Sequence, residues 1–273
     1  MKRRPLLHSL AAGSALLSAG CVDSVPFVTG PPKSDDVFSS YRFEGADLVV
    51  EFREDVIVEE VVFYDEDTDE EHETVSHPGE TARFRVIFPE TFETRLTGMP
   101  HVKAKTADGW TSEWAFGSVH AWTNHVEALP DGRARFDIQN QGDSPLLIRF
   151  VAISGDVPNP TVDPQSESFD RSSLGFDPGV IGVGANQPLT PDRPDLIVPG
   201  GETRAFETTY APFAFPDGAP ANACDGAERT GKVTVVHGRG GSAAYSFDYR
   251  LTGEQSSVNG GGAVACSLES NTA

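Results

Sequence analysis

The sequence predicts an all-β protein made of two antiparallel β-sandwich domains. The dominant hydrophobic period along the chain is two residues, as in strands that bury one face. The alternating runs are short and are separated by Gly, Pro, Asn and Asp, the residues that favour turns. No segment carries the apolar stripe of an amphipathic helix. Short alternating runs without helices are typical of β-sandwiches.

Five runs show the alternation most clearly. They are Leu48, Val50 and Phe52; Phe84, Val86 and Phe88; Val102, Ala104 and Thr106; Ala134, Phe136 and Ile138; and Tyr245, Phe247, Tyr249 and Leu251. The first three runs place one sandwich domain at residues 37–118, and the last two place a second at 119–253. A proline-rich loop over 154–200 interrupts the second domain, and such long loops are usually functional or disordered.

Residues 1–20 are predicted to be a signal peptide. Positive charges near the N-terminus precede an apolar stretch and then small residues, which is the pattern of a secretory signal. The apolar stretch is too short to span a bilayer. We therefore expect the chain to be exported.

The leader also carries two patterns of known export routes. The segment with Arg3, Arg4, Leu6 and Leu7 resembles the twin-arginine signal. Ala19 and Gly20, directly before Cys21, resemble a lipobox, although Ser18 stands where Leu is usual. The resemblance implies cleavage before Cys21, lipid attachment to its thiol, and a flexible tether over residues 21–36. A plain signal peptide cut elsewhere and a retained N-terminal anchor are the alternatives.

The chain has three cysteines, and an odd number in an exported protein requires an explanation. A lipid on Cys21 supplies one, and Cys224 and Cys266 would then form a disulfide in an oxidising compartment. That disulfide would hold a Ser- and Gly-rich tail at 254–273 against the second domain. Two separate thiols are the alternative, because the sequence does not supply their distance.

The charge is strongly acidic, with 41 Asp and Glu against 21 Lys and Arg. It argues against nucleic acid as a partner, since binding phosphate requires a basic surface. Cleavage after residue 20 would remove three basic side chains and no acidic one, leaving 18 basic side chains and a net charge of −23. Together with the leader, this lysine-poor composition resembles the exported lipoproteins of extremely halophilic archaea. We expect such a surface to carry hydrated salt cations without a defined site.

Two stretches resemble known sandwich modules. The segment 102–114 resembles the last hairpin of a fibronectin type III or related immunoglobulin-like domain, with Asp108 and Gly109 at its turn. Trp110 and Trp114 in this hairpin are interpreted as packing and capping residues. The segments 133–146 and 199–203 resemble turns and strands of exported immunoglobulin-like modules. The resemblance implies an immunoglobulin-like fold for both domains.

The strongest charge cluster, residues 65–73, contains the only candidate cation site. Asp65, Asp67 and Asp69 alternate and could direct oxygens at one hard cation such as Ca²⁺. Glu70 and Ser76 depart from the EF-hand pattern, which requires Gly and Glu there. The alternative is a solvated acidic hairpin tip.

No catalytic or cofactor pattern is present in the sequence. It lacks a GxSxG elbow, a Ser-x-x-Lys pair, an HExxH segment and a dinucleotide-binding glycine run. We therefore expect no enzyme activity, no catalytic residue and no cofactor.

These observations predict a cell-surface lipoprotein that acts as a non-enzymatic protein-interaction or structural display module. It would be anchored by lipid at the outer face of the cell membrane and would contact an envelope protein. The candidate binding residues are Leu174, Phe176 and Ile181, within the proline-rich loop. The alternative is that these apolar residues simply cover a sandwich edge. A solute- or cation-binding lipoprotein and an extracellular hydrolase with an unrecognised site are the alternatives.

Overall fold

The computed structural model describes residues 30–115, 117–123, 125–167, 169, 196–208, 211–238 and 241–266. The signal segment 1–20, Cys21 and the loop residues Leu174, Phe176 and Ile181 lie outside these ranges. By its contacts, Pro31–Ala273 is one compact unit. No helix in the described ranges is long and apolar enough to cross a membrane.

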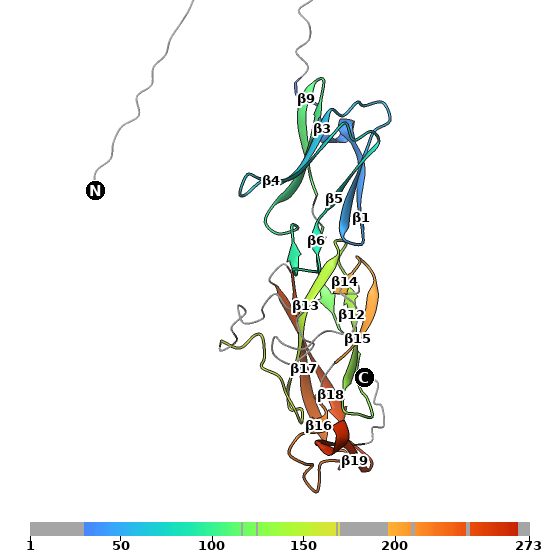
Figure 1. The fold of residues 1–273 in the computed structure, drawn as a ribbon, viewed down its shortest axis with the longest axis vertical. Helices are drawn as coiled ribbons and strands as arrows, with labels where there is room; N and C mark the ends of the chain where they lie inside the picture. Colours follow the sequence, from blue (N-terminus) through green and yellow to red (C-terminus); the bar gives the residue numbers. More distant parts are fainter. Residues whose placement is uncertain are drawn as a thin grey trace, which may run out of the picture. The chain divides into compact units, whose positions relative to one another are not determined.

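The N-terminal strands form two sheets and a short ribbon, all antiparallel (Figure 1). One sheet has the order β1-β2-β5, with β1 at Phe38–Glu44, β2 at Asp47–Phe52 and β5 at Thr81–Arg85. The other has the order β4-β3-β8-β9, with β3 at Glu60–Asp65, β4 at Glu70–Ser76, β8 at Pro100–Thr106 and β9 at Gly109–Trp114. The ribbon pairs β6 (Ile87–Phe88) with β7 (Glu93–Thr94), and a single helical turn, α1 (Ser34–Val37), precedes β1.

These two sheets pack face to face through predicted apolar positions, such as Leu48 and Phe84, and through Phe63, which lies outside the predicted runs. Leu48 and Phe84, on β2 and β5, are fully buried, as is Phe63 on β3. The Phe63 and Phe84 rings lie 5.7 Å apart between centroids, which joins one sheet to the other. The period-two interpretation of this region is confirmed for β2, β5 and β8, where the alternate apolar residues are buried: Leu48, Val50 and Phe52; Ala82 and Phe84; Val102 and Ala104.

The C-terminal strands form three further antiparallel sheets. The first contains β10 (Ala121–Trp122), β11 (Val126–Ala128), β12 (Ala134–Asn140) and β15 (Thr203–Glu207), with β12 pairing all three others. The second has the order β14-β13-β17-β18, at Ile197–Val198, Leu146–Gly155, Glu228–His237 and Ser242–Arg250. The third has the order β16-β20-β19, at Ala214–Phe215, Ala263–Cys266 and Gln255–Val258, with η3 (Asn259–Gly261) between β19 and β20.

The buried residues of β12, β13 and β17 form one continuous core with those of β15. Phe136 and Phe206 stack with their ring centroids 6.1 Å apart, and Ile148 and Val233 are fully buried. The all-β, antiparallel sandwich class predicted from the sequence is therefore confirmed in both halves of the chain. Within the described residues, every strand pairing lies inside 38–114 or inside 121–266. The independence of the two predicted domains stays a prediction.

The predicted disulfide is present, with the Cys224 and Cys266 Cα atoms 5.6 Å apart. The region beside it differs from the expected tail, because 255–266 forms the hairpin β19–η3–β20 against β16. Its turn contains Gly260 and Gly261 at positive φ of 67° and 95°, which glycine adopts without steric cost. Sequence patterning missed β19 because its first three residues are all exposed and polar.

Candidate interaction surface

An aromatic and basic surface occupies the outward side of the sheet β4-β3-β8-β9. On β8, Val102 and Ala104 face the core, so the alternation of a strand directs His101 and Lys103 outward. The same rule places Tyr64 of β3 and Trp110 and Trp114 of β9 on this side, as their registers with β8 require. We call these five residues, Tyr64, His101, Lys103, Trp110 and Trp114, the aromatic face.

Three of the rings form a row across three strands. His101 is opposite Trp114 on β9 and opposite Tyr64 on β3. The ring centroids are 5.3 Å apart for His101 and Trp114 and 5.7 Å apart for Tyr64 and His101. His101 is only 8% exposed, and its Nδ1 and Nε2 lie 3.0 Å from Met99 O and 3.3 Å from a Glu66 carboxylate oxygen. These contacts fix the imidazole of His101, the central ring of the row.

Lys103 lies between two further aromatic neighbours. Its Nζ is 5.1 Å from the Tyr64 ring centroid and 5.4 Å from that of Trp110, within the range of cation–π attraction. The same Nζ donates to Glu71 Oε1 at 2.6 Å. The neighbouring Lys105 pairs with Glu59 at 3.2 Å. The two lysine charges are thus balanced locally by carboxylates.

The two indoles are the exposed part of the aromatic face. Trp110 is 41% exposed and Trp114 is 43% exposed. Their interpretation as packing residues holds in part, because Trp110 contacts Lys103 and Trp114 contacts His101. The remainder of each ring points to solvent, since β9 is an edge strand. The signal available in the sequence was the period-two spacing of Trp110, Ser112 and Trp114 after a turn. A fixed surface of this kind can bind an amphipathic partner.

The candidate cation site lies at the β3–β4 hairpin. Asp65 is 8% exposed, and its Oδ1 accepts the backbone N–H groups of Asp67 at 2.8 Å and Thr68 at 3.3 Å. One carboxylate oxygen therefore closes the turn, while Asp67 and Asp69 are exposed. Among the described residues, no group of three acidic, His or Cys side chains is arranged to hold a metal ion. The cation site stays a prediction without support from this geometry.

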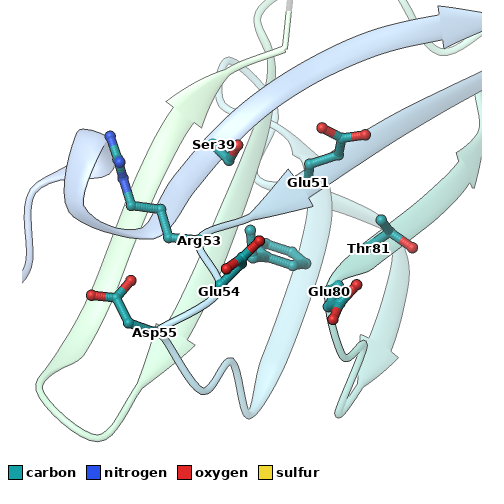
Figure 2. Close-up of a pocket in the computed structure, with 8 residues that line it drawn as sticks. Ser39, Glu51, Arg53, Glu54, Asp55, Glu80 and Thr81 are labelled. Atoms are coloured by element: carbon teal, nitrogen blue, oxygen red, sulfur yellow. The ribbon is translucent and has the colours of Figure 1, made fainter.

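A second acidic feature is a depression of about 530 Å³ at the end of the sheet β1-β2-β5 (Figure 2). The residues that line it are Ser39, Glu51, Phe52, Arg53, Glu54, Asp55, Glu80 and Thr81. Glu51 is already engaged, since it accepts from Ser40 Oγ at 2.7 Å and from Arg42. Figure 2 shows Arg53 directed away from Glu51 and Glu80, and its Nε donates to Asp35 O at 2.6 Å. The depression therefore has carboxylates but no assembled ligand set.

The first part of the proline-rich loop is fastened to β13 and β17. Thr161 Oγ1 donates to Ile153 O at 2.9 Å, and the Phe169 ring stacks on Phe150 with centroids 6.0 Å apart. Lys232 Nζ donates to Asp163 Oδ2 at 2.7 Å. Burial raises the pKa of the Asp163 carboxyl, but the hydrogen bonds from Lys232 and the Gln165 N–H outweigh this, and the pKa is lowered. These contacts hold the first part of the loop against the sheet of the sandwich.

The turn at Gly142-Asp143-Ser144, which superficially suggests a serine nucleophile, has a structural role. Ser144 is fully buried, and its carbonyl accepts Asn140 Nδ2 at 2.7 Å. A hydroxyl in this position does not meet a substrate from solvent. The serine belongs to the core of the turn.

Comparison with known proteins identifies no family for this chain. No family model and no curated protein matches it. Among solved structures, a point mutant of Salmonella alpha-2-macroglobulin is 8% identical, with a TM-score of 0.24. The match covers 79% of this chain and 16% of that protein. The fibronectin(III)-like modules of Clostridium thermocellum CbhA are 12% identical, with a TM-score of 0.20 and coverage of 78% of this chain and 90% of theirs. Likenesses this weak decide neither fold nor function, and the β-sandwich assignment rests on the strand pairing described above.

Proposed function

We propose that this protein is an exported, lipid-anchored, non-enzymatic module that displays its β-sandwiches at the outer face of the cell membrane. The observation that carries the proposal is the Cys224–Cys266 disulfide. It accounts for two of the three cysteines and leaves Cys21, which directly follows the signal pattern at residues 1–20. Disulfides persist in oxidising compartments, in agreement with export.

The intact mass of the protein, extracted from native membranes without reductant, tests this proposal. The expected species begins at Cys21, carries an added lipid and lacks the two hydrogens of one disulfide. A Cys21→Ser variant should lose the lipid mass and appear in the medium, whereas a Ser24→Ala variant should behave as the parent does. An unmodified chain, or one that retains residues 1–20, would overturn the lipid anchor.

The partner in this proposal is an envelope protein that contacts the proline-rich loop. The anchoring of Thr161 and Phe169 to the sheet supports this choice, because recognition loops are commonly held by a rigid scaffold. Val162, between them in sequence, is 59% exposed. The candidate binding residues Leu174, Phe176 and Ile181 follow in the sequence of the same loop.

Photo-crosslinking on intact cells tests the partner site. A photoreactive residue at Val162 should give one discrete cross-linked product. The matched control is Ile57, a branched aliphatic residue that is 82% exposed on the loop after β2 and is expected to give none. Equal products from both positions, or none from Val162, would contradict a partner at the loop.

A further inference from the structure

We infer that the aromatic face of the β8–β9 hairpin lies against the lipid–water interface of the membrane that anchors the chain, with Trp110 and Trp114 at the level of the headgroups. This inference rests on the proposed lipid anchor at Cys21. It specifies which face of the sandwich is turned toward the membrane, in addition to the membrane anchoring itself.

The tether meets the sandwich beside the hairpin that carries the indoles. A Cβ built on Gly109, the first residue of β9, would lie 3.9 Å from Pro32 Cδ. The chain just after Pro32 is fixed, since Asp35 O accepts Arg53 Nε at 2.6 Å and Val37 is 2% exposed. The point at which the described chain begins to pack on the sandwich therefore lies beside Gly109, the residue before Trp110.

The tether is short. Eleven residue steps separate Cys21 from Pro32, so the fully extended segment reaches at most about 40 Å. As a flexible chain it would span roughly 20 Å on average. A lipid inserted at Cys21 thus keeps the β8–β9 hairpin within a few tens of ångströms of the bilayer, which raises its effective concentration there.

The aromatic face has the chemistry of an interfacial anchor. Indole combines an apolar ring with an N–H donor, and Trp and Tyr are enriched at membrane–water interfaces for this reason. Trp110 and Trp114 lie on the same side of one regular strand, about 13 Å apart along it. Two such anchors on one side of a strand can enter the same planar interface.

Charge does not provide the attraction of this face to a membrane. After the proposed cleavage before Cys21 the chain carries a net charge of −23, which opposes its approach to anionic headgroups. Lys103 of the aromatic face and the neighbouring Lys105 are paired with Glu71 and Glu59, and the Glu66 carboxylate lies beside His101. Because these ion pairs are internal, we expect the indoles rather than the lysines to provide the attraction, and binding to survive high salt.

The three tryptophans of the chain allow a direct test. Single-tryptophan proteins are made by combining W110F, W114F and W122F in pairs, purified from native membranes and reconstituted in phosphatidylcholine vesicles with brominated acyl chains. Trp122 is the matched control, because it is 36% exposed but lies on β10, outside the hairpin. Emission from Trp110 and from Trp114 should fall about twofold relative to unbrominated vesicles, as expected for indoles at the interface. Emission from Trp122 should be unchanged, and the pattern should persist in 1 M KCl.

The outcomes separate this inference from the proposed function, because the intact mass of each preparation reports the lipid independently. Lipid on Cys21 without quenching of Trp110 and Trp114 overturns the orientation and leaves the anchor in place. Quenching of Trp110 and Trp114 in a preparation whose Cys21 carries no lipid overturns the covalent anchor and supports the affinity of the aromatic face for membranes. Equal quenching of all three tryptophans overturns the inference. Protection of Trp110 and Trp114 from aqueous iodide without quenching by bromolipid also overturns it, and indicates a protein on this face.

Discussion

Asn140 illustrates how a single buried amide holds the turn after β12. It is fully buried, and its Nδ2 donates to Ser144 O at 2.7 Å and to Val198 O at 3.0 Å. Its Oδ1 accepts the Gly142 N–H at 3.0 Å. One side chain therefore satisfies backbone groups from the turn and from β14, which are distant in sequence.

Substitution Asn140→Ala should lower the free energy of unfolding by about 2–4 kcal/mol, because it leaves buried backbone groups without partners. Urea denaturation measures this loss. Gln141→Ala, at the exposed neighbouring position, should change stability by less than about 0.5 kcal/mol. Equal effects of the two substitutions would contradict the role assigned to Asn140.

The Asp163–Lys232 ion pair makes the stability of the fold depend on pH. The pKa of Asp163 is lowered in the folded state, because hydrogen bonds from Lys232 and Gln165 outweigh the effect of burial. A lowered carboxyl pKa stabilises the fold above the unfolded-state value of about 3.9, and this stability is lost as pH falls through the lower folded-state pKa.

Asp163→Asn should therefore cost roughly 0.5–1 kcal/mol near neutral pH, a value kept small because both side chains are partly exposed. The difference from the parent should shrink as the pH falls below about 4. Urea denaturation across this range provides the measurement. In a Lys232→Met background the substitution should have little effect at any pH, and a cost that persisted there would show that the ion pair is not its source.

Among the elements, the hairpin β19–η3–β20 depends on the disulfide most directly. Cys266 is the last residue of β20, and Cys224 lies 42 residues earlier, outside any strand. The hairpin buries small side chains such as Ala263 and Ala265, and among the described strands its one partner is the two-residue strand β16. Such limited packing makes a covalent connection important.

Replacing both Cys224 and Cys266 by Ser should lower the free energy of unfolding by about 2–4 kcal/mol, from the loop entropy released in the unfolded chain. Hydrogen exchange should show the largest loss of protection at Ser256, Ser257 and Ala265. The amides of β12 serve as the internal reference, since that strand pairs on both sides. Uniform loss of protection in β12 and β20 would contradict a local role of the disulfide.

For the whole molecule, the excess of negative charge makes the free energy of unfolding depend on ionic strength. Ion pairs such as Arg83 with Glu44 and Asp47 offset some of it on the sheet β1-β2-β5. The net charge of −20 remains, and self-repulsion of like charges opposes the compact state at low ionic strength.

The free energy of unfolding should therefore rise by roughly 1–3 kcal/mol between low salt and 1 M KCl, where the Debye length falls to about 3 Å. Thermal or urea unfolding at several KCl concentrations measures this change. Raising the ionic strength with a second monovalent salt should reproduce it. Stability that is constant or falls with salt would contradict the electrostatic origin.

The sequence alone determined those features that depend on residues close together along the chain. Alternation at positions such as Leu48, Val50 and Phe52 predicts strands and hence the all-β sandwich, because the period of side chains along a strand is local. Counting cysteines was enough to suggest the pairing of Cys224 with Cys266. Both predictions are confirmed.

Only the tertiary structure decided which distant residues share a surface. Tyr64, His101 and Trp114 form one row because β3, β8 and β9 pair in a particular register. That register follows from packing over long sequence separations, which no local pattern contains. The same holds for Pro32 beside Gly109. Composition and periodicity thus determined the kind of fold, whereas strand register decided where its exposed aromatic side chains gather.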